Sequence, residues 1–190
     1  GGKYTILYDG ANIAKGLNDI TNCAVSADVS VSTAQAANGF YVGGAAYIAA
    51  RANADMTCGY EFGIGVSQNG NAYIRLYRRG VSNSQVLYQK PDSVTGVGAI
   101  KQNTSYNLKL ITAGNRIICY VNNVLVVDMT DDTYTSGNVG IHNVSAKGVF
   151  DNFEVQSVPE QKAEKLEITS HSDTVSLVGK VYFTVKVTYN

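Results

Sequence analysis

The sequence predicts an all-β protein whose centre is a β-meander over residues 106–155. Short runs in this stretch alternate apolar and polar residues with a period of two, and none has the 3.6-residue period of a helix. Turn-forming residues separate the runs, first Ala113-Gly114-Asn115 and then Asn122-Asn123. The chain also contains 13 Tyr and 19 Gly residues, a composition that suits an all-β module better than a helical one.

Within the meander, each run is expected to form one strand. Asparagine tolerates positive φ better than other non-glycine residues, so Asn122-Asn123 predicts a tight turn between two paired strands. A polar loop over residues 130–138 precedes the last two runs. The expected strands are residues 107–112, 116–121, 124–129, 139–143 and 150–155.

Towards the N-terminus, residues 3–8 predict a short edge strand and residues 9–19 a loop. Residues 23–31 alternate regularly and predict a half-buried strand. Residues 33–44 are expected to be a loop and residues 53–57 a turn. Residues 45–52 are ambiguous by composition, because their many alanines favour a helix.

Residues 60–67 and 71–79 predict a hairpin whose loop length follows from parity. The apolar residues of both strands share one face only if Ser67 pairs with Asn71 across a three-residue loop. This loop requires a type I turn with Gly70 in the left-handed region. Gly63 then lies opposite Arg75, and the other face carries Glu61, Gly63, Gly65, Tyr73, Arg75, Tyr77 and Arg79.

After a short strand at residues 86–89 and a connection over residues 90–105, the meander closes a first domain at residues 1–156. Residues 157–165 are polar, contain Pro159 and predict a linker. Residues 166–190 then contain two strand-like runs, too few for an independent core. Either they dock on the sandwich or they begin a truncated immunoglobulin-like domain. We favour the second interpretation, because VYFTVKVTYN resembles a strand of bacterial immunoglobulin-like repeats.

Charge and cysteine content exclude some classes and leave one question open. The formal net charge is zero, which argues against nucleic acid or an anionic membrane as the main partner. No apolar run approaches the roughly 20 residues of a membrane helix. Cys119 alternates with apolar neighbours and is expected to be a buried thiol, whereas a Cys23–Cys58 disulfide stays an open alternative.

The motif YNLKLITAGNRIICYVNNVLVVDMTDDTYTSGNVGI, followed by FDNFEV, resembles the C-terminal half of concanavalin A-like, laminin-G-like jelly rolls. More narrowly, it resembles levan-binding-type carbohydrate-binding modules, the lectin-like domain of galactocerebrosidase and the 3-keto-disaccharide hydrolase-like domain of bacterial glycoside hydrolases. The resemblance covers roughly residues 20–156, and the family's usual Asn-Gly turn is Asn122-Asn123 here. It implies a two-sheet antiparallel jelly-roll sandwich in which residues 45–52 form a core strand ending at Arg51.

The Tyr and Arg side chains of the hairpin are the first candidate ligand site. Tyr rings stack on the apolar faces of sugars, and Arg donates paired hydrogen bonds. The alternative is a solvent-facing row whose aromatic rings cover neighbouring glycines. Related jelly rolls often bind at end loops instead, where Arg51 would lie with Asp55, Tyr134 and His142. The candidate ligand-binding residues are Arg51, Glu61, Tyr73, Arg75, Tyr77 and Arg79.

Metal binding and catalysis have weaker support. Related domains often bind Ca²⁺ where the first and last strands meet, which implies a structural calcium held by Asp9 or Asn12 with Asp151. A glycosidase needs two carboxylates across the scissile bond, whereas Glu61 is the only Glu within residues 1–153. The related glucanases carry several acidic residues on one strand, and no such run occurs here. A hydrolase remains the minor alternative through the 3-keto-disaccharide hydrolase-like resemblance.

The sequence therefore predicts a non-catalytic carbohydrate-binding module of a larger secreted or cell-surface bacterial protein, a glycoside hydrolase by the resemblance. Its expected partners are a polysaccharide chain end or glycan and the flanking domains of the parent protein, with no nucleic acid and no membrane insertion. The alternative is a structural or adhesive laminin-G-like module of a multidomain cell-surface protein with a protein partner.

Overall fold

The computed structural model describes residues 2–13, 17–35, 41–91, 93–159, 163–168 and 185–189. The chain divides into two compact units, Gly1–Val158 and Pro159–Asn190, each described by itself below. The boundary falls within the stretch predicted to be the linker. Across the described residues, no helix has the length and apolar character needed to cross a membrane.

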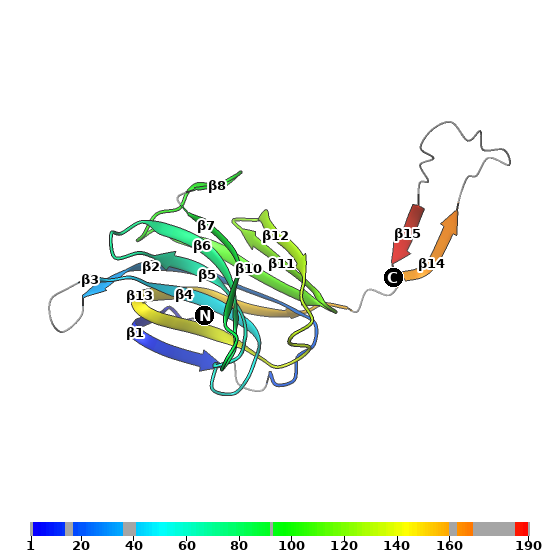
Figure 1. Cartoon of the computed structure of the whole chain (residues 1–190), viewed down its shortest axis with the longest axis horizontal. Helices are drawn as coiled ribbons and strands as arrows, with labels where there is room; N and C mark the ends of the chain where they lie inside the picture. Colours follow the sequence, from blue (N-terminus) through cyan, green and yellow to red (C-terminus); the bar gives the residue numbers. More distant parts are fainter. Residues whose placement is uncertain are drawn as a thin grey trace. The chain divides into compact units, whose positions relative to one another are not determined.

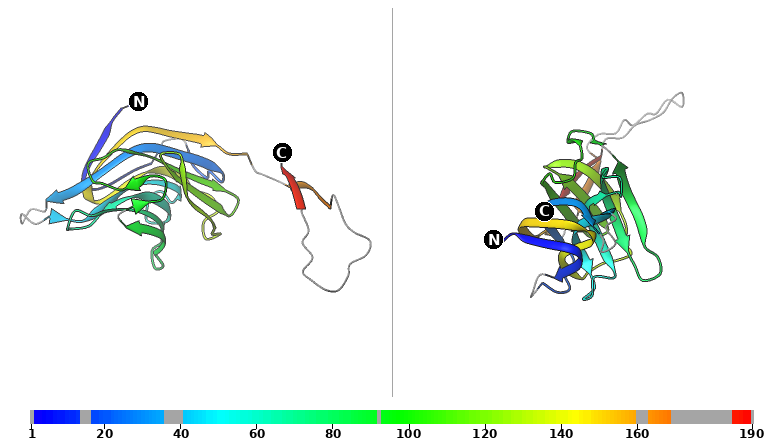
Figure 2. Two further views of the ribbon diagram at one scale, coloured as in Figure 1. Left: turned by 90° about the horizontal axis from the view of Figure 1, so that it is seen from above. Right: turned by 90° about the vertical axis from the view of Figure 1, so that its left-hand side faces the viewer.

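The first unit is a single, strongly curved antiparallel sheet of eleven strands (Figures 1 and 2). Nine strands follow the hydrogen-bonded order β12-β11-β10-β2-β13-β4-β5-β6-β7, while β1 pairs with β13 and β3 with β2. A separate pair is formed by the short strands β8 (Ser93–Val94) and β9 (Gly98–Ala99). The sheet strands are β1 (Tyr4–Ile13), β2 (Cys23–Gln35), β3 (Tyr41–Val42), β4 (Gly44–Ala52), β5 (Gly59–Val66), β6 (Ala72–Arg79), β7 (Gln85–Pro91), β10 (Tyr106–Ala113), β11 (Arg116–Val121), β12 (Val124–Thr130) and β13 (Asn138–Ser157).

The long strand β13 joins the two halves that the sequence predicted to be separate sheets. Its first part pairs with β4, its second part with β2, and β1 pairs with it across the junction. The predicted strands at residues 139–143 and 150–155 are therefore one strand of 20 residues. Irregularities in the pairing at Asn138/Gly140 and at Asp151/Glu154 accompany its curvature (Figure 2). The fold has one folded sheet rather than two independent ones.

The core lies between the two halves of this sheet. Alternating side chains from each half point inward and form one continuous buried cluster, because successive residues of a strand face opposite sides. The alternation predicted for residues 23–31 is confirmed, since its apolar members from Cys23 to Val31 are buried. The fully buried members include Val25, Ile48, Phe62, Ile64, Ile74, Leu76, Leu108, Leu110, Ile117 and Cys119.

The β5–β6 hairpin has the predicted three-residue loop. Ser67 N donates to Asn71 O at 2.9 Å, and Gly70 N donates to Ser67 O at 2.9 Å. Gly70 has a φ of 82°, in the left-handed region. Val66 consequently pairs with Ala72. This register sends the apolar residues of both strands into the core and their other residues to the outer face, the sheet face turned away from the core.

Other local predictions had mixed outcomes. Asn122 and Asn123 form the expected tight turn, with φ values of 50° and 64° as in a type I′ turn. Residues 45–52 are a strand, as the resemblance implied. The predicted loop over residues 9–19 is wrong at its start, because β1 continues to Ile13 past a bulge between Tyr8 and Gly10. Likewise β2 continues to Gln35 into the predicted loop over residues 33–44.

All three cysteines are free thiols, so the Cys23–Cys58 alternative is not realised. Cys119 is buried as predicted, and burial raises the pKa of its thiol well above the ordinary value. The Cys23 sulfur lies 3.7 Å from the Thr112 hydroxyl, and burial raises its pKa as well. Neither buried thiol is placed to act as a nucleophile.

The second unit contains an antiparallel pair, β14 (Ala163–Ile168) and β15 (Val185–Tyr189). Two strands were predicted there. All the residues between them lie outside the described part of the chain. One pair of strands does not support the immunoglobulin-like interpretation.

Candidate functional site: a pocket on the outer face

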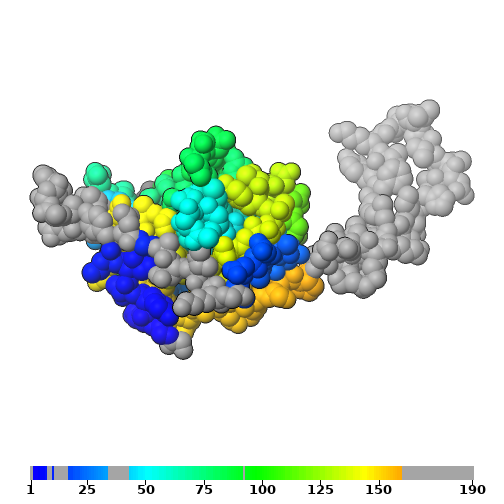
Figure 3. Space-filling view, turned by 90° about the horizontal axis from the view of Figure 1, so that it is seen from below, coloured from blue at the N-terminus to red at the C-terminus, as the bar shows by residue number. Residues whose placement is uncertain are grey.

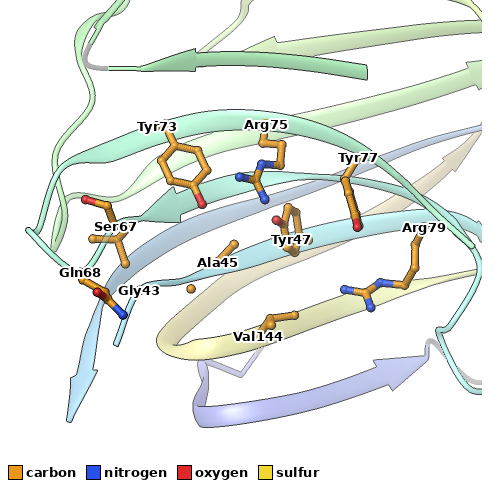
Figure 4. Close-up of a pocket in the computed structure, with 12 residues that line it drawn as sticks. Gly43, Ala45, Tyr47, Ser67, Gln68, Tyr73, Arg75, Tyr77, Arg79 and Val144 are labelled. Carbon is orange, nitrogen blue, oxygen red and sulfur yellow. The ribbon is translucent and has the colours of Figure 1, made fainter. Parts of the chain in front are cut away.

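The outer face of β4, β5 and β6 carries a pocket of about 450 Å³. Ala72, Ile74 and Leu76 of β6 point into the core, so the alternate residues of the same strand must point outward. Figure 4 shows the outward side chains of β6 directed towards Tyr47 on β4 and Val144 on β13. The pocket is lined by Gly43, Gly44, Ala45, Tyr47, Val66, Ser67, Gln68, Tyr73, Arg75, Tyr77, Arg79 and Val144.

The predicted row of alternating Tyr and Arg residues forms one wall of this pocket. The guanidinium carbon of Arg75 lies 4.7 Å from the centroid of the Tyr73 ring, and that of Arg79 lies 5.7 Å from the Tyr77 ring. These are cation–π distances. Arg75 Nε also donates to Gln89 Oε1 at 2.9 Å. Each guanidinium is therefore held against a neighbouring ring and is partly withdrawn from solvent.

Tyr47 is a pocket residue that was not predicted from the sequence. It pairs with Gly63 on one side and with His142 on the other, and its side chain is only 3% exposed. Burial raises the pKa of Tyr47, an effect that the nearby Arg75 guanidinium only partly offsets. The hydroxyl is thus a neutral hydrogen-bonding group at physiological pH. Gly63 has no side chain and leaves room for the Tyr47 ring. This glycine was the one feature of the sequence that could have indicated the position of Tyr47.

Glu61 lies beneath the end of the row and holds Arg79. Its carboxylate is 2% exposed, and Oε1 accepts from Arg79 Nε at 2.9 Å and lies 2.8 Å from His142 Nδ1. The other oxygen, Oε2, has no hydrogen-bond partner among the described residues. Glu61 is not one of the pocket-lining residues. It positions Arg79, whereas it was predicted to be one of the ligand-binding residues.

His142 was expected to join Arg51 at the end loops, but it lies on β13, within the expected strand at residues 139–143, and faces Tyr47 on β4. Its ring stacks on Tyr47, with ring centroids 6.4 Å apart and an interplanar angle of 24°. Together with its contact to Glu61, this packing makes His142 part of the pocket's support.

Aromatic rings fill the space above Gly63 and Gly65. The Tyr73 ring lies over Gly65 so closely that a Cβ there would collide with it. A Cβ at Gly63 would meet the Ala46 carbonyl and the Tyr47 ring. The alternative in which aromatic rings cover glycines is therefore realised at both positions. The pocket is bounded by tyrosine rings, and the two glycines make their close approach possible.

Arg51, expected to bind ligand, ties together three loops away from the pocket. Its guanidinium donates to Thr21 O at 2.9 and 2.6 Å, to Gly114 O at 2.7 Å and to Tyr134 O at 2.8 Å. It is 2% exposed and has a φ of 52°. Figure 3 shows these segments together on one face: blue before β2, cyan after β4 and green to yellow-green beyond β10. The structure does not bring Arg51 together with the Tyr and Arg row.

Asp55, also expected at these end loops, is exposed and bonds within its own turn. Its carboxylate accepts from the Thr57 hydroxyl at 2.7 Å and from the Thr57 amide at 3.2 Å. Those hydrogen bonds lower the Asp55 pKa.

The residues predicted to hold calcium are not neighbours in the backbone register. Asn12 pairs with Ile141 on β13, ten positions before Asp151, and Asp151 itself pairs with Asp28. The side chains of Asp9 and Asn12 lie outside the described part. Within that part, no group of three or more His, Cys, Asp or Glu residues could hold a metal. Calcium binding stays a prediction, tested by the melting temperature with calcium and with a chelator.

Two acidic residues at the end of β12, Asp128 and Asp131, are paired with arginines of the protein. Asp128 pairs with Arg116 at 2.5 Å, and Asp131 pairs with Arg78 at 2.7 Å. Asp131 Oδ1 also accepts from the Tyr60 hydroxyl at 2.6 Å. These contacts support a structural role for both carboxylates.

No family model and no curated protein matches this sequence. Among solved structures, the carbohydrate-binding module CBM66 from Bacillus subtilis is 18% identical, with a TM-score of 0.55 over 82% of this chain and 83% of that one. A putative glycosyl hydrolase from Parabacteroides distasonis is 13% identical, with a TM-score of 0.53 over 83% and 87%. A GH16 enzyme from a mixed-linkage glucan locus of Bacteroides ovatus is 9% identical, with a TM-score of 0.50 over 82% and 80%.

At these identities the likeness concerns the fold, because one jelly roll supports many functions. The matched structures include both a binding module and hydrolases. With its curved antiparallel sheet and its single core, this chain has the concanavalin A-like jelly-roll fold.

Proposed function

We propose that this chain is a non-catalytic carbohydrate-binding module of a larger secreted bacterial protein, a glycoside hydrolase by its sequence resemblance. The observation that carries the proposal is the outer-face pocket, which joins tyrosine rings to guanidinium donors. Tyr offers an apolar ring and a hydroxyl, and Arg offers paired donors that match neighbouring oxygens. The volume of about 450 Å³ lies within the range of roughly 300–1,000 Å³ that is usual for small-molecule sites.

A sugar at the end of a chain suits this pocket better than a long internal stretch. Ser67 and Gln68 of the hairpin loop bound it at one end, and Arg79 bounds it at the other. The sequence contains no Trp, so no indole platform extends along the sheet. This supports recognition of a terminal residue by hydrogen bonds, in keeping with the resemblance to levan-binding-type modules.

The lack of a carboxylate in the pocket supports binding without hydrolysis. None of the residues lining the pocket is an Asp or a Glu, and the buried carboxylate of Glu61 lies beneath Arg79 and accepts its hydrogen bond. A glycosidase places two carboxylates on either side of the scissile bond. The module would instead raise the local concentration of an attached enzyme at its polysaccharide.

The adhesive alternative requires an apolar surface patch, and the described residues give it less support. The large exposed apolar side chains are spread over β1, the β6–β7 loop, β7 and β12. Single exposed apolar residues are normal on soluble proteins. They are Tyr4, Leu7, Val81, Val86 and Leu125.

Affinity electrophoresis of the 190-residue chain in gels containing soluble polysaccharides tests the proposal. We expect retardation by at least one polysaccharide, and we expect Tyr77→Ala to abolish it because that ring forms part of the pocket wall. Arg116 is an exposed β11 residue paired with Asp128, and Arg116→Ala is the control. Relative to its own mobility in a gel without polysaccharide, this variant should be retarded as much as the parent chain. Retardation that survives Tyr77→Ala would place the site elsewhere, and no retardation by any polysaccharide would contradict the proposal.

A further inference from the structure

Resting on the proposed function, we propose that the outer-face pocket prefers an acidic sugar, and that Arg75 binds the sugar's carboxylate. The first observation is the charge of the pocket. Its lining includes two guanidinium groups, those of Arg75 and Arg79, and no carboxylate. A hollow with this lining attracts an anion more strongly than a neutral ligand, because charges interact more strongly where water is partly excluded.

The two guanidinium groups are not equivalent. Arg79 is neutralised from beneath by Glu61, whose Oε1 accepts from Arg79 Nε at 2.9 Å. Arg75 forms no ion pair among the described residues, and its Nε donates to the neutral amide oxygen of Gln89. Of the two positive charges, the one on Arg75 is therefore uncompensated.

The geometry of Arg75 fits a planar oxyanion. Gln89 fixes the guanidinium through Nε and the Tyr73 ring supports it from one side, 4.7 Å from ring centroid to guanidinium carbon. The guanidinium also hydrogen-bonds the Tyr47 hydroxyl. Its terminal nitrogens carry four N–H groups, and they point into the pocket (Figure 4). A guanidinium held in this way presents two parallel donors, the arrangement that binds a carboxylate through both oxygens.

Tyr47 supplies the neutral part of the recognition. Its ring lies in the wall opposite β6, and burial keeps its hydroxyl protonated. A protonated hydroxyl donates to or accepts from a sugar without repelling an anion. The pocket thus combines one anchoring charge with neutral hydroxyls, a combination that suits a uronic acid at a chain end. A sulfated sugar offers the same oxyanion chemistry, and the test separates the two.

The test compares matched ligands by isothermal titration calorimetry on the 190-residue chain. Oligosaccharides of galacturonate, glucuronate, mannuronate and guluronate are each paired with their methyl esters, which keep the sugar backbone and remove the charge. We expect at least one acid to bind about tenfold more tightly than its ester, as the loss of a charge-assisted hydrogen bond predicts. The advantage should shrink with added salt. Sulfated galactan and its desulfated form are the second arm.

Variants then assign the preference to one residue. Arg75→Gln should remove the difference between acid and ester, whereas Arg75→Lys should keep the salt dependence with weaker affinity, since Lys is a point charge. Arg116→Gln, with the same change in net charge, should keep the preference. Thermal melting confirms that each variant is folded.

The outcomes separate this inference from the proposed function. Equal affinity for acid and ester in the parent chain, with sugar binding present, overturns the acidic preference and leaves the module a neutral lectin. A preference for the sulfated chain supports the oxyanion site and assigns it to sulfate. A preference that survives Arg75→Gln contradicts the role of Arg75. Silence from every ligand of this panel overturns the acidic preference, and the proposed function then stands or falls with retardation by other polysaccharides in the affinity gels.

Discussion

Replacing Arg51 with methionine should destabilise the first unit and leave sugar binding intact. The side chain is 2% exposed and gives four hydrogen bonds to three loop carbonyls, those of Thr21, Gly114 and Tyr134. Methionine has a similar length and fills most of the same volume, so the change isolates the loss of these hydrogen bonds rather than creating a cavity.

The expected loss is about 3–5 kcal/mol of unfolding free energy. A hydrogen bond to a charged group contributes roughly 1.5–3 kcal/mol, but carbonyls at loop ends regain some solvation once the guanidinium is gone. For a domain of this size, that corresponds to a fall in melting temperature of about 10 °C. Arg116→Met is the matched control, because an exposed ion pair contributes no more than about 1 kcal/mol.

Urea unfolding followed by circular dichroism measures both variants, and affinity electrophoresis below the transition measures binding. A loss below about 1 kcal/mol for Arg51→Met would refute the view that Arg51 ties the loops together. Loss of sugar binding by a fully folded Arg51→Met protein would restore Arg51 to the ligand site, as first expected from the sequence.

Three further predictions concern single positions. Asn123→Gly should raise stability by about 0.5 kcal/mol in urea unfolding, because glycine relieves the second left-handed position of the type I′ turn; a decrease would contradict the turn assignment. Gly63→Ala should cost about 2–4 kcal/mol, because a Cβ there would meet a β4 carbonyl and a ring; unchanged stability would show that β4 and β5 are less closely packed. Burial alone would raise the pKa of Asp131, but hydrogen bonds from Tyr60 and Thr133 outweigh burial and hold the pKa below the ordinary value. The ionised Asp131 therefore contributes its full stabilisation above the unfolded pKa of about 3.9, and this stabilisation is lost as the pH falls further. Plots of unfolding free energy against pH for the parent chain and Asp131→Asn should converge at low pH; parallel curves would contradict this.

Elements fixed by local pattern were predictable from the sequence. The β5–β6 hairpin is an example: parity demanded that Ser67 face Asn71, and Gly70 supplied the left-handed residue that a three-residue loop needs. That register also set Gly63 opposite Arg75 and placed the Tyr and Arg row on the outer face. The row was predictable because it depends on neighbouring residues of one hairpin.

Features that depend on long-range pairing were not predictable. Tyr47 lies in a run of alanines whose composition leaves helix and strand undecided, and it reaches the pocket only through pairing with β5 and β13. His142 falls within the expected strand at residues 139–143, but its place beside Tyr47 depends on the pairing of β13 with β4, which the sequence does not show. The continuity of β13 from Asn138 to Ser157 converts the two expected sheets into one.

The contacts of Arg51 were not predictable either, because a charged residue at the end of an apolar strand has two opposite interpretations. An exposed arginine at a strand end is a candidate ligand group, whereas a buried one must find acceptors within the protein. The positive φ of Arg51 and the three carbonyls that meet there decide the matter. Those carbonyls belong to loops that are 30 to 83 residues away in sequence, so the pattern around Arg51 does not show them.

Screening the 190-residue chain on a glycan array that pairs neutral and acidic chain ends, together with its Tyr77→Ala variant, tests the central claim most directly. We predict binding to a restricted group of glycans sharing one terminal sugar, and loss of that binding in the variant. Silence across the array, or binding unchanged by Tyr77→Ala, would contradict a carbohydrate site in the outer-face pocket.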